Sequence, residues 1–274
     1  MSGEKVKLMG IINLTPDSFS DGGKFAGVEA ALRRAEKLIA EGADILDLGA
    51  ESTRPGALEI SAEEELARLI EPLREIRKNF KDIAISVDTY KASVAKQALL
   101  SGANMINDVW GGMRSAFFKD ENFSTCDIAA DFDCKIVLMH NRPDFFKPIS
   151  DLRSELFSDF DKILENARAC GVPYKNIILD GGFGFAKNAE QNLELLKNYS
   201  CLGKYGFPLM LGLSKKSTLK KVVGAENAPL ATCFFNAYAL AASSCDILRV
   251  HDAKEHKILL ESFGAISKSK TWTK

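Results

Sequence analysis

The sequence alternates from end to end between short apolar runs and longer runs with helical periodicity. The apolar runs are continuous, which is typical of strands in a parallel sheet that is covered on both faces. The expected strands are residues 6–14, 45–48, 83–88, 105–108, 135–139, 177–180, 209–213 and 247–250. Because a helical run follows each strand without a linker-like gap, the pattern predicts a single (β/α)8 TIM barrel over residues 1–268. A doubly wound open sheet is the alternative.

The junctions between helices and strands carry a repeated glycine. Gly42, Gly102 and Gly171 each end a helical run shortly before a strand. Glycine is favoured at such positions because it adopts the left-handed backbone conformation that ends many helices. The C-terminal residues 269–274 lie beyond the last helical run and are expected to fray.

Composition excludes several classes of partner. The 36 Lys and Arg residues are balanced by 37 Asp and Glu, so nothing draws the chain generally to nucleic acid or to an anionic membrane. The chain lacks both an apolar run of about 18 residues and the apolar core of a signal peptide. The six cysteines form no Cys-x-x-Cys pair, which favours reduced, mostly buried thiols. A soluble, cytoplasmic protein is therefore expected.

Polar residues stand where nearly every predicted strand ends. Each one alone would be interpreted as a cap of the following helix. In a barrel, however, the carboxyl ends of the strands meet on one rim, and burying so many polar groups there is costly without a ligand. The pattern therefore predicts a site for a small, polar, partly anionic molecule. The residues are Asn13, Asp47, Asp88, Asn107, Asp108, His140, Asp180, Ser214, Lys216, Arg249 and His251.

Two loops are long for a barrel, residues 15–25 after the first strand and 51–56 after the second. The second loop presents Thr53 and Arg54, whose hydroxyl and guanidinium suit phosphate oxygens. Gly182 and Gly184 only weakly resemble a dinucleotide fingerprint, because a third glycine and an acidic ribose partner are missing. Lys216 fits either a Schiff-base lysine or a cation for a carboxylate. His256, on the last helical run, is predicted to be an ordinary surface side chain.

Together these motifs closely resemble dihydropteroate synthases over essentially the whole chain. The motifs are residues 13–23 (NLTPDSFSDGG), 51–56 (ESTRPG), 86–89 (SVDT), 106–109 (INDV), 139–140 (MH), 180–185 (DGGFGF), and 214–217 (SKKS) with 249–252 (RVHD). The first two of these motifs are the most specific. The resemblance implies condensation of 6-hydroxymethyl-7,8-dihydropterin pyrophosphate with para-aminobenzoate, with Mg²⁺ as cofactor and release of pyrophosphate. It also implies a homodimer.

The resemblance assigns roles to individual residues. The pterin pyrophosphate would be bound by Thr53, Asp88, Asn107, Asp180, Lys216, Arg249 and His251. Para-aminobenzoate would be bound by Phe19, Pro55, Phe185 and Ser217. Asn13 would be the protein ligand of Mg²⁺, which prefers to keep waters and phosphate oxygens in its other positions. Catalysis would rest on Asp21, Lys216 and Arg54, with Asp21 stabilising a pterin methylene cation that the arylamine attacks.

Two positions depart from the pattern of the family. Gly181 stands where proline is usual and is expected to loosen the turn beneath Phe185. Lys215 stands where arginine is frequent and lacks its bidentate fork. Three alternative functions remain open from the residues: a pterin-binding methyltransferase domain, a non-catalytic pterin-binding protein, and a Schiff-base aldolase acting through Lys216.

Overall fold

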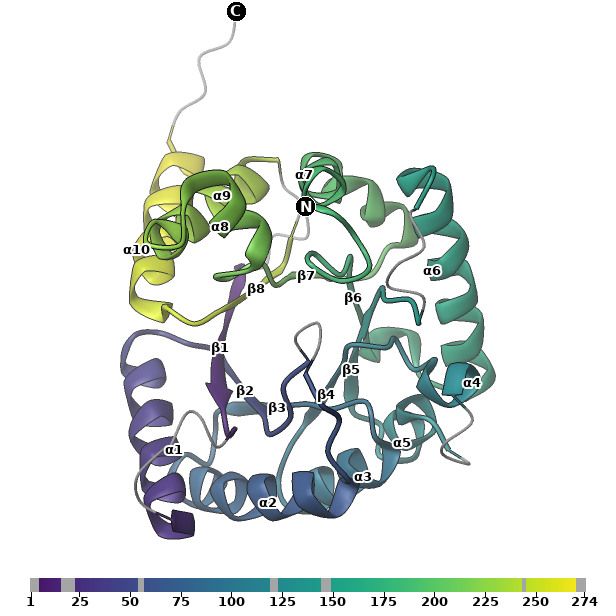
Figure 1. Ribbon diagram of the computed structural model, residues 1–274. Helices are drawn as coiled ribbons and strands as arrows, with labels where there is room; N and C mark the ends of the chain where they lie inside the picture. The colour runs from purple at the N-terminus through teal and green to yellow at the C-terminus, as the bar shows by residue number, and fades with distance from the viewer. Residues whose placement is uncertain are drawn as a thin grey trace, which may run out of the picture.

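The computed structural model describes residues 5–15, 23–53, 57–118, 123–143, 149–242 and 245–269. Within these residues, eight parallel strands close into a barrel in chain order (Figure 1). They are β1 (Lys7–Asn13), β2 (Ile45–Gly49), β3 (Ala84–Asp88), β4 (Met105–Asp108), β5 (Lys135–Met139), β6 (Ile177–Asp180), β7 (Leu209–Leu211) and β8 (Ile247–Val250). Met9 pairs with Ile45 of β2 on one side and with Arg249 of β8 on the other. This closure confirms the barrel and excludes the open sheet.

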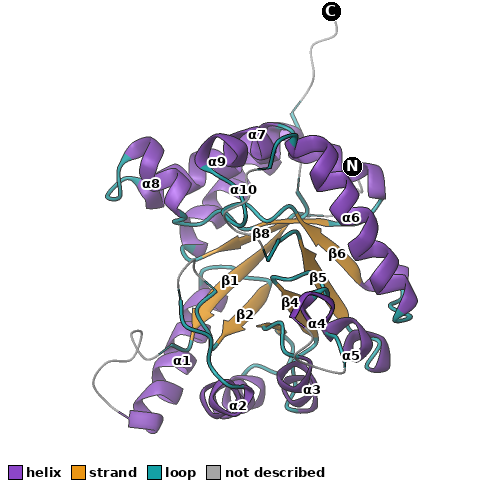
Figure 2. Ribbon diagram, turned by 45° about the vertical axis from the view of Figure 1, so that its right-hand side comes forward, coloured by secondary structure: helices purple, strands orange, loops and turns teal. Residues whose placement is uncertain are grey.

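Helices form the outer layer around the strands (Figure 2). The α-helices are α1 (Gly23–Ala40), α2 (Ala62–Asn79), α3 (Ala92–Leu100), α4 (Arg114–Phe118), α5 (Thr125–Asp131), α6 (Leu152–Ala169), α7 (Ala189–Lys197), α8 (Ser217–Val223), α9 (Ala228–Ala241) and α10 (Ala253–Ser267). Two 3-10 helices, η2 (Tyr174–Asn176) and η3 (Tyr199–Tyr205), precede β6 and β7. None of the helices in the described part of the chain combines the length and apolar composition needed to cross a membrane.

Most of the core falls into two parts, because every strand residue points either into the barrel or toward the helices. The larger part fills the space between strands and helices, with Leu8, Leu46 and Leu248 among its fully buried members. The smaller part closes the inside of the barrel. It consists of Met9, Ile45, Met105, Val137, Ile178, Met210 and Ile247. This apolar plug is the floor on which the polar rim rests.

The glycines at the helix ends behave as predicted. Gly42, Gly102 and Gly171 have φ angles of +96°, +112° and +82°. At Gly102 the requirement is also steric, since a Cβ there would lie 2.8 Å from Cγ of Arg77. These junctions turn the chain from a helix into the next strand at little conformational cost.

Two predictions about buried residues need correction. His256 is fully buried rather than on the surface, with Nδ1 2.7 Å from the carbonyl oxygen of Asp252 and Nε2 2.9 Å from Nδ2 of Asn236. All six cysteines are free thiols, as expected, but only Cys126, Cys134 and Cys245 are buried, and Cys201 is exposed.

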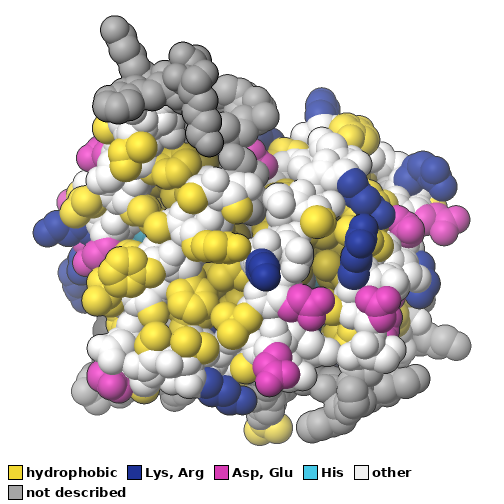
Figure 3. Space-filling model, turned by 90° about the horizontal axis from the view of Figure 1, so that it is seen from above, with side chains coloured by type: hydrophobic (Ala, Val, Ile, Leu, Met, Phe, Trp, Pro, Cys, Tyr) yellow, Lys and Arg dark blue, Asp and Glu magenta, His cyan; other side chains and the backbone are white. Residues whose placement is uncertain are grey.

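One side of the helical layer exposes apolar side chains. Leu230, Phe234 and Tyr238 are spaced four residues apart along α9 and are 61%, 65% and 49% exposed. Such spacing places them on one face of the helix. Ile258 and Ile266 of α10 are also exposed, and Figure 3 looks onto this side of the molecule, where hydrophobic side chains gather.

Candidate active site

The polar rim follows from the two-residue period of the strands. Asp47, Asn107, Asp180 and Arg249 each stand two residues beyond a member of the apolar plug, namely Ile45, Met105, Ile178 and Ile247. They therefore point to the same inside of the barrel, one layer closer to its carboxyl end. In each of these four strands, one inward-facing side chain is apolar and the next inward-facing side chain, two residues later, is polar.

Arg249 links the acidic side chains in one half of the rim. Its Nε donates to Oδ2 of Asp47 at 2.6 Å, and its Nη2 donates to Oδ2 of Asp88, also at 2.6 Å. Asn107 adds a bond from Nδ2 to Oδ2 of Asp47 at 3.2 Å. Burial raises the pKa of Asp88 to about 7, although the charge of Arg249 opposes that shift. The predicted residues Asp88, Asn107 and Arg249 are thus brought together, with Asp47 between them.

Asp180 and Lys216 occupy the other half of the rim. Burial raises the pKa of Asp180, and the charge of Lys216 acts against that shift. Burial lowers the pKa of Lys216 to about 8. The Lys216 ammonium donates to the carbonyl oxygen of Phe183 and lies 4.6 Å from the centre of the Phe185 ring. A Cβ at Gly212 would be 3.6 Å from Asp180 and 3.7 Å from Arg249, so this glycine leaves space between the two halves.

The remaining predicted residues lie around the edge of the site. Nδ1 of His251 is 2.9 Å from the hydroxyl of Ser214, and burial lowers the pKa of His251 to about 4. Ser217 is exposed at the first residue of α8, directly after Lys216. Thr53 is half-buried beyond β2, and Asn13 is exposed at the end of β1. Phe19, Asp21, Arg54 and Pro55 lie outside the described residues.

Several buried oxygens of the rim accept no hydrogen bond from the described part of the protein. They are Oδ1 of Asp47, Oδ1 of Asp88 and Oγ of Ser86. A buried polar atom without a partner is costly unless a ligand or water bonds it. Together with the cations Arg249 and Lys216, these acceptors suit a small molecule that offers N–H donors and carries negative charge elsewhere.

Tyr199 is a residue of the site that the sequence did not reveal. Its hydroxyl accepts from the N–H of Gly181 at 2.8 Å, donates to the carbonyl oxygen of Met210, and lies 3.4 Å from Oδ1 of Asp180. A proline at position 181 would have no N–H to donate, and a Cβ there would lie 2.7 Å from Cε2 of Tyr199. Gly181 is therefore bonded to the core, which corrects the expectation of a loosened turn.

Lys187 is a second such residue, half-buried behind the turn that follows β6. Its ammonium contacts His140 and two backbone carbonyls. Asp47 was recognised as a strand-end residue, but its link to Arg249 spans 202 positions in the sequence. The sequence gives no comparable indication that Tyr199 and Lys187 belong to the site, because neither residue stands at the end of a strand.

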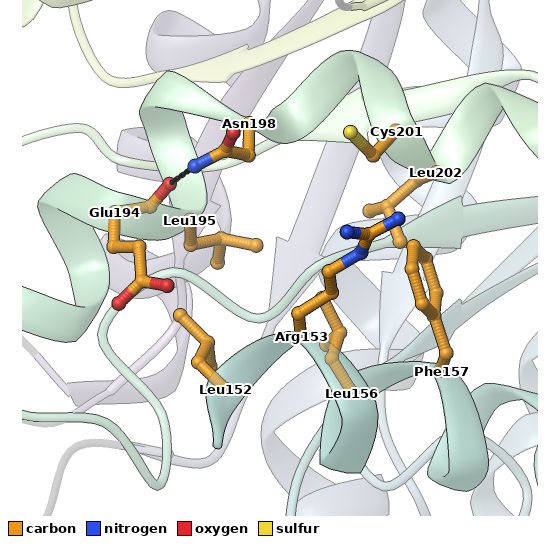
Figure 4. Close-up of a pocket in the computed structure, with 9 residues that line it drawn as sticks. All are labelled: Leu152, Arg153, Leu156, Phe157, Glu194, Leu195, Asn198, Cys201 and Leu202. Carbon is orange, nitrogen blue, oxygen red and sulfur yellow. Dashed lines mark hydrogen bonds between the residues drawn. The ribbon is translucent and has the colours of Figure 1, made fainter.

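A cavity of about 270 Å³ lies elsewhere, in the helical layer between α6, α7 and η3 (Figure 4). Leu152, Leu156 and Leu195 contribute to its lining, with Arg153 and Cys201 beside them. No residue of the rim lines it, so this cavity is separate from the candidate active site.

Comparison with known proteins agrees with this geometry. Residues 9–251 match the family described as "Pterin binding enzyme". The chain belongs to the pterin-binding enzyme family. A relative from Clostridium beijerinckii named dihydropteroate synthase is 41% identical, with 93% of this chain and 91% of the relative covered.

Solved structures of pterin-binding enzymes show the same fold. Dihydropteroate synthase from Clostridium difficile, solved in the presence of pteroic acid, has a TM-score of 0.88 and 39% identity, covering 97% of this chain and 98% of that one. The Xanthomonas albilineans enzyme, solved with 4-aminobenzoic acid, has a TM-score of 0.88 and 34% identity, covering 97% and 95%.

Proposed function

We propose that this chain is a dihydropteroate synthase: it condenses 6-hydroxymethyl-7,8-dihydropterin pyrophosphate with para-aminobenzoate to give 7,8-dihydropteroate and pyrophosphate, a step of folate biosynthesis. The observation that carries the proposal is the rim of buried acceptors and cations in a chain whose relatives over most of its length are dihydropteroate synthases. The enzyme is thus a transferase whose acceptor is an arylamine.

The pterin is proposed to bind between the two halves of the rim. Asp180 and Asn107 offer a carboxylate and an amide to the donor and acceptor edge of the aminopyrimidinone ring. Asp88 adds an acceptor, Oδ1, that the described protein groups leave unbonded. Arg249 and Lys216 of the rim, together with His251 and Thr53 at its edge, are proposed to hold the pyrophosphate group.

The second substrate is proposed to bind where Phe185 and Ser217 flank Lys216. The ring of Phe185 would contact the ring of para-aminobenzoate, while Ser217 and Lys216 would hold its carboxylate. Phe19 and Pro55 are proposed to complete this pocket. Departure of pyrophosphate gives a pterin methylene cation, which Asp21 stabilises, Arg54 helps to shield from water, and the arylamine attacks in an SN1-like step.

A single magnesium ligand fits the end of β1. The amide oxygen of Asn13 is a hard donor on an exposed side chain, and it accepts no hydrogen bond from the described residues. One such oxygen suits Mg²⁺, which usually keeps several waters and phosphate oxygens. We propose that Asn13 would hold the ion, which would supply positive charge to the departing pyrophosphate. An N13A variant should need more Mg²⁺ to bind pyrophosphate in calorimetry, and an unchanged requirement would contradict this role.

The experiment that tests the function is release of pyrophosphate from the pterin substrate, measured with and without para-aminobenzoate. Release that depends on para-aminobenzoate, with formation of 7,8-dihydropteroate, is expected. Binding of the pterin without release would instead indicate a non-catalytic pterin-binding protein. Methyl transfer without release would indicate a methyltransferase domain, and borohydride trapping of substrate on Lys216 an aldolase.

The apolar face of α9 supports a homodimer. Leu230, Phe234 and Tyr238 form an exposed apolar row on one helix, and contiguous exposed apolar surface of this kind often marks a protein interface. We propose that a second copy of the chain covers it. In analytical ultracentrifugation, Phe234→Asp should yield monomer, whereas Leu100→Asp, at a similarly exposed leucine (62%) of α3, should not. A monomeric wild type would overturn this proposal.

A further inference from the structure

The ammonium of Lys187 has three acceptors within hydrogen-bonding distance. They are Nδ1 of His140 at 2.9 Å and the carbonyl oxygens of Gly182 and Phe185, each at 3.1 Å. A lysine ammonium has three N–H donors and no acceptor, so these three partners satisfy it completely. Lys187 thus bonds both ends of the turn that runs from residue 182 to residue 185.

Asp159, which is itself bonded by Arg142, fixes the orientation of His140. Its Nε2 lies 3.2 Å from Oδ2 of Asp159, and Arg142 donates to the same oxygen at 2.6 Å. If Lys187 donates to Nδ1, the imidazole must be neutral and must carry its proton on Nε2, facing Asp159. Burial lowers the pKa of His140 to about 4, which is consistent with the neutral ring.

The turn that Lys187 holds has an unusual backbone. Gly182 and Gly184 of the turn and Ala186 directly after it have positive φ angles, of +69°, +84° and +48°. For Ala186 that conformation is costly, because its Cβ crowds the backbone. A Cβ at Gly182 would come within 2.0 Å of the carbonyl oxygen of His140, so the turn packs directly on the strand end that carries this histidine.

The same turn carries two groups of the proposed second-substrate site. Phe185 is its last residue, and the carbonyl oxygen of Phe183 is the acceptor that the Lys216 ammonium contacts. Two lysines therefore bond three of the backbone carbonyls of the turn, those of Gly182, Phe183 and Phe185. A shift of the turn would displace the Phe185 ring and the Lys216 ammonium together.

We propose that Lys187, oriented by His140 and Asp159, is a positioning residue that fixes the turn 182–185 and so places Phe185 and Lys216 for the arylamine substrate. This inference rests on the proposed function, because it assigns a role in the same reaction. Lys187 is bonded to the carbonyls of the turn and to His140, so its effect should be larger on binding of the second substrate than on binding of the pterin.

The pH dependence should reveal this role. Asp180 and Asp159 face Lys187 with negative charge, Lys216 and Arg142 face it with positive charge, and His140 is the neutral contact. Burial lowers the pKa of Lys187 to about 7. Above that pH a neutral amine has only two protons for three acceptors, so KM for para-aminobenzoate should rise as the pH increases past neutrality.

The test compares Lys187→Met with Lys197→Met, a matched change at an exposed lysine of α7. In Lys187→Met we expect KM for para-aminobenzoate to rise about tenfold to hundredfold. We also expect the rise with pH to be lost and the pterin dissociation constant to change less than KM for para-aminobenzoate, because the hydrogen bonds of Lys187 go to the turn and His140 rather than to Asp180. Unchanged KM and pH dependence in Lys187→Met would overturn the inference, provided that the wild type turns over. A wild type without turnover would instead refute the proposed function.

A second pair of variants covers the case in which Lys187→Met does not fold. His140→Asn keeps an acceptor close to the position of Nδ1, whereas His140→Leu removes it. KM for para-aminobenzoate should therefore rise more in the leucine variant than in the asparagine variant, and equal effects would contradict the bond to Lys187. Because the chain has three histidines, ¹⁵N NMR can follow each ring. A neutral Nε2–H ring for His140 at pH 6 is expected, and a charged or Nδ1–H ring would overturn the inference.

Discussion

Asp108 and Asp180 are both buried at the ends of strands, yet their surroundings give them different roles. Asp108 accepts from the N–H groups of Trp110 at 2.7 Å and Gly112 at 3.0 Å, and also from the hydroxyl of Thr125. Both of its oxygens are therefore used to hold the loop after β4. Asp180 bonds the N–H of Gly182 through Oδ1, and its Oδ2 accepts no bond from the described residues. Only Asp180 keeps an oxygen for a ligand.

This difference predicts the effect of Asp180→Asn. The amide would present donors to the donor edge of the pterin, and the charge-assisted bond would be lost. We expect the pterin affinity to fall by about 2–3 kcal/mol, measured by calorimetry on the folded variant. Asp108→Asn should lower the free energy of unfolding more than the pterin affinity. Equal pterin affinity in Asp180→Asn and the wild type would remove Asp180 from the pocket.

Gly181 gives a second prediction at this scale. A Cβ there would meet Cε2 of Tyr199 at 2.7 Å and Cδ1 of Leu195 at 3.2 Å. Gly181→Ala should therefore lower the free energy of unfolding by about 1–3 kcal/mol, as overpacking of a core does. The control is Gly264→Ala in α10, where a Cβ meets nothing within 4 Å, and where alanine should stabilise by about 0.5–1 kcal/mol. Urea denaturation measures both, and a neutral Gly181→Ala would show that Tyr199 moves freely.

At the scale of elements, the strands were predictable because their signal is local. β4, β5, β6 and β8 have the expected bounds, since each is a continuous apolar run that ends at a polar rim residue or at the loop beyond it. The rim residues were predictable for the same reason, because parallel strands bring their carboxyl ends together. The strand β7 ends at Leu211 rather than at residue 213, and β1 covers Lys7–Asn13 rather than residues 6–14.

The residues that escaped prediction act through distant partners. Lys187 contacts His140 across 47 positions, and Tyr199 serves Gly181 from a 3-10 helix that the apolar pattern does not indicate. His256 was wrongly predicted to be exposed, because its hydrogen-bond partner, Asn236, lies on a different helix. The bond to Asn236 offsets the cost of burying the imidazole. A pattern within one segment carries no information about such pairs.

Three elements are joined by one half-buried lysine. The ammonium of Lys91, just before α3, lies 2.7 Å from Glu51, after β2, and 2.7 Å from Glu65 of α2. Glu51 also accepts from the N–H of Ile60 at 2.9 Å. The two carboxylates are only 5% and 1% exposed, and Lys91 is the cation that pairs with both of them. This cluster closes the base of the loop that contains Thr53.

Lys91→Met should therefore destabilise the protein by about 3–5 kcal/mol, because it leaves buried carboxylates unpaired. Burial raises the pKa of Glu65, and Lys91 opposes this shift. Without Lys91 the folded state should bind a proton that the unfolded state has released, so the variant should lose stability as the pH rises above about 4.5. Urea denaturation at pH 5 and pH 8 measures this, with the exposed Lys96→Met as control. A pH-independent loss would contradict the carboxylate explanation.

At the scale of the molecule, closure of the barrel means that the first strand packs against the last strand and the last helix. β8 pairs with β1, and α10 packs against β1 and α9. The fully buried His256 of α10 bonds Asn236 of α9, and Lys257 of α10 covers Gly42, where a Cβ would meet its Cδ at 2.8 Å. Residues from both ends of the chain therefore share one core, and no division into separately stable parts is expected.

Truncation tests this dependence and the predicted boundary at residue 268. Removal of residues 269–274 should leave the thermal midpoint unchanged within about one degree, because the last described residues, Lys268 and Ser269, are exposed. Removal of everything after Asp252 deletes α10 and uncovers β1, α9 and the amide of Asn236. That shorter chain should lose the cooperative thermal transition altogether, because the barrel and its helical layer share a continuous core. Circular dichroism and calorimetry can follow both chains. A cooperative transition in the chain that ends at Asp252 would show that α10 is an appendage rather than part of the barrel.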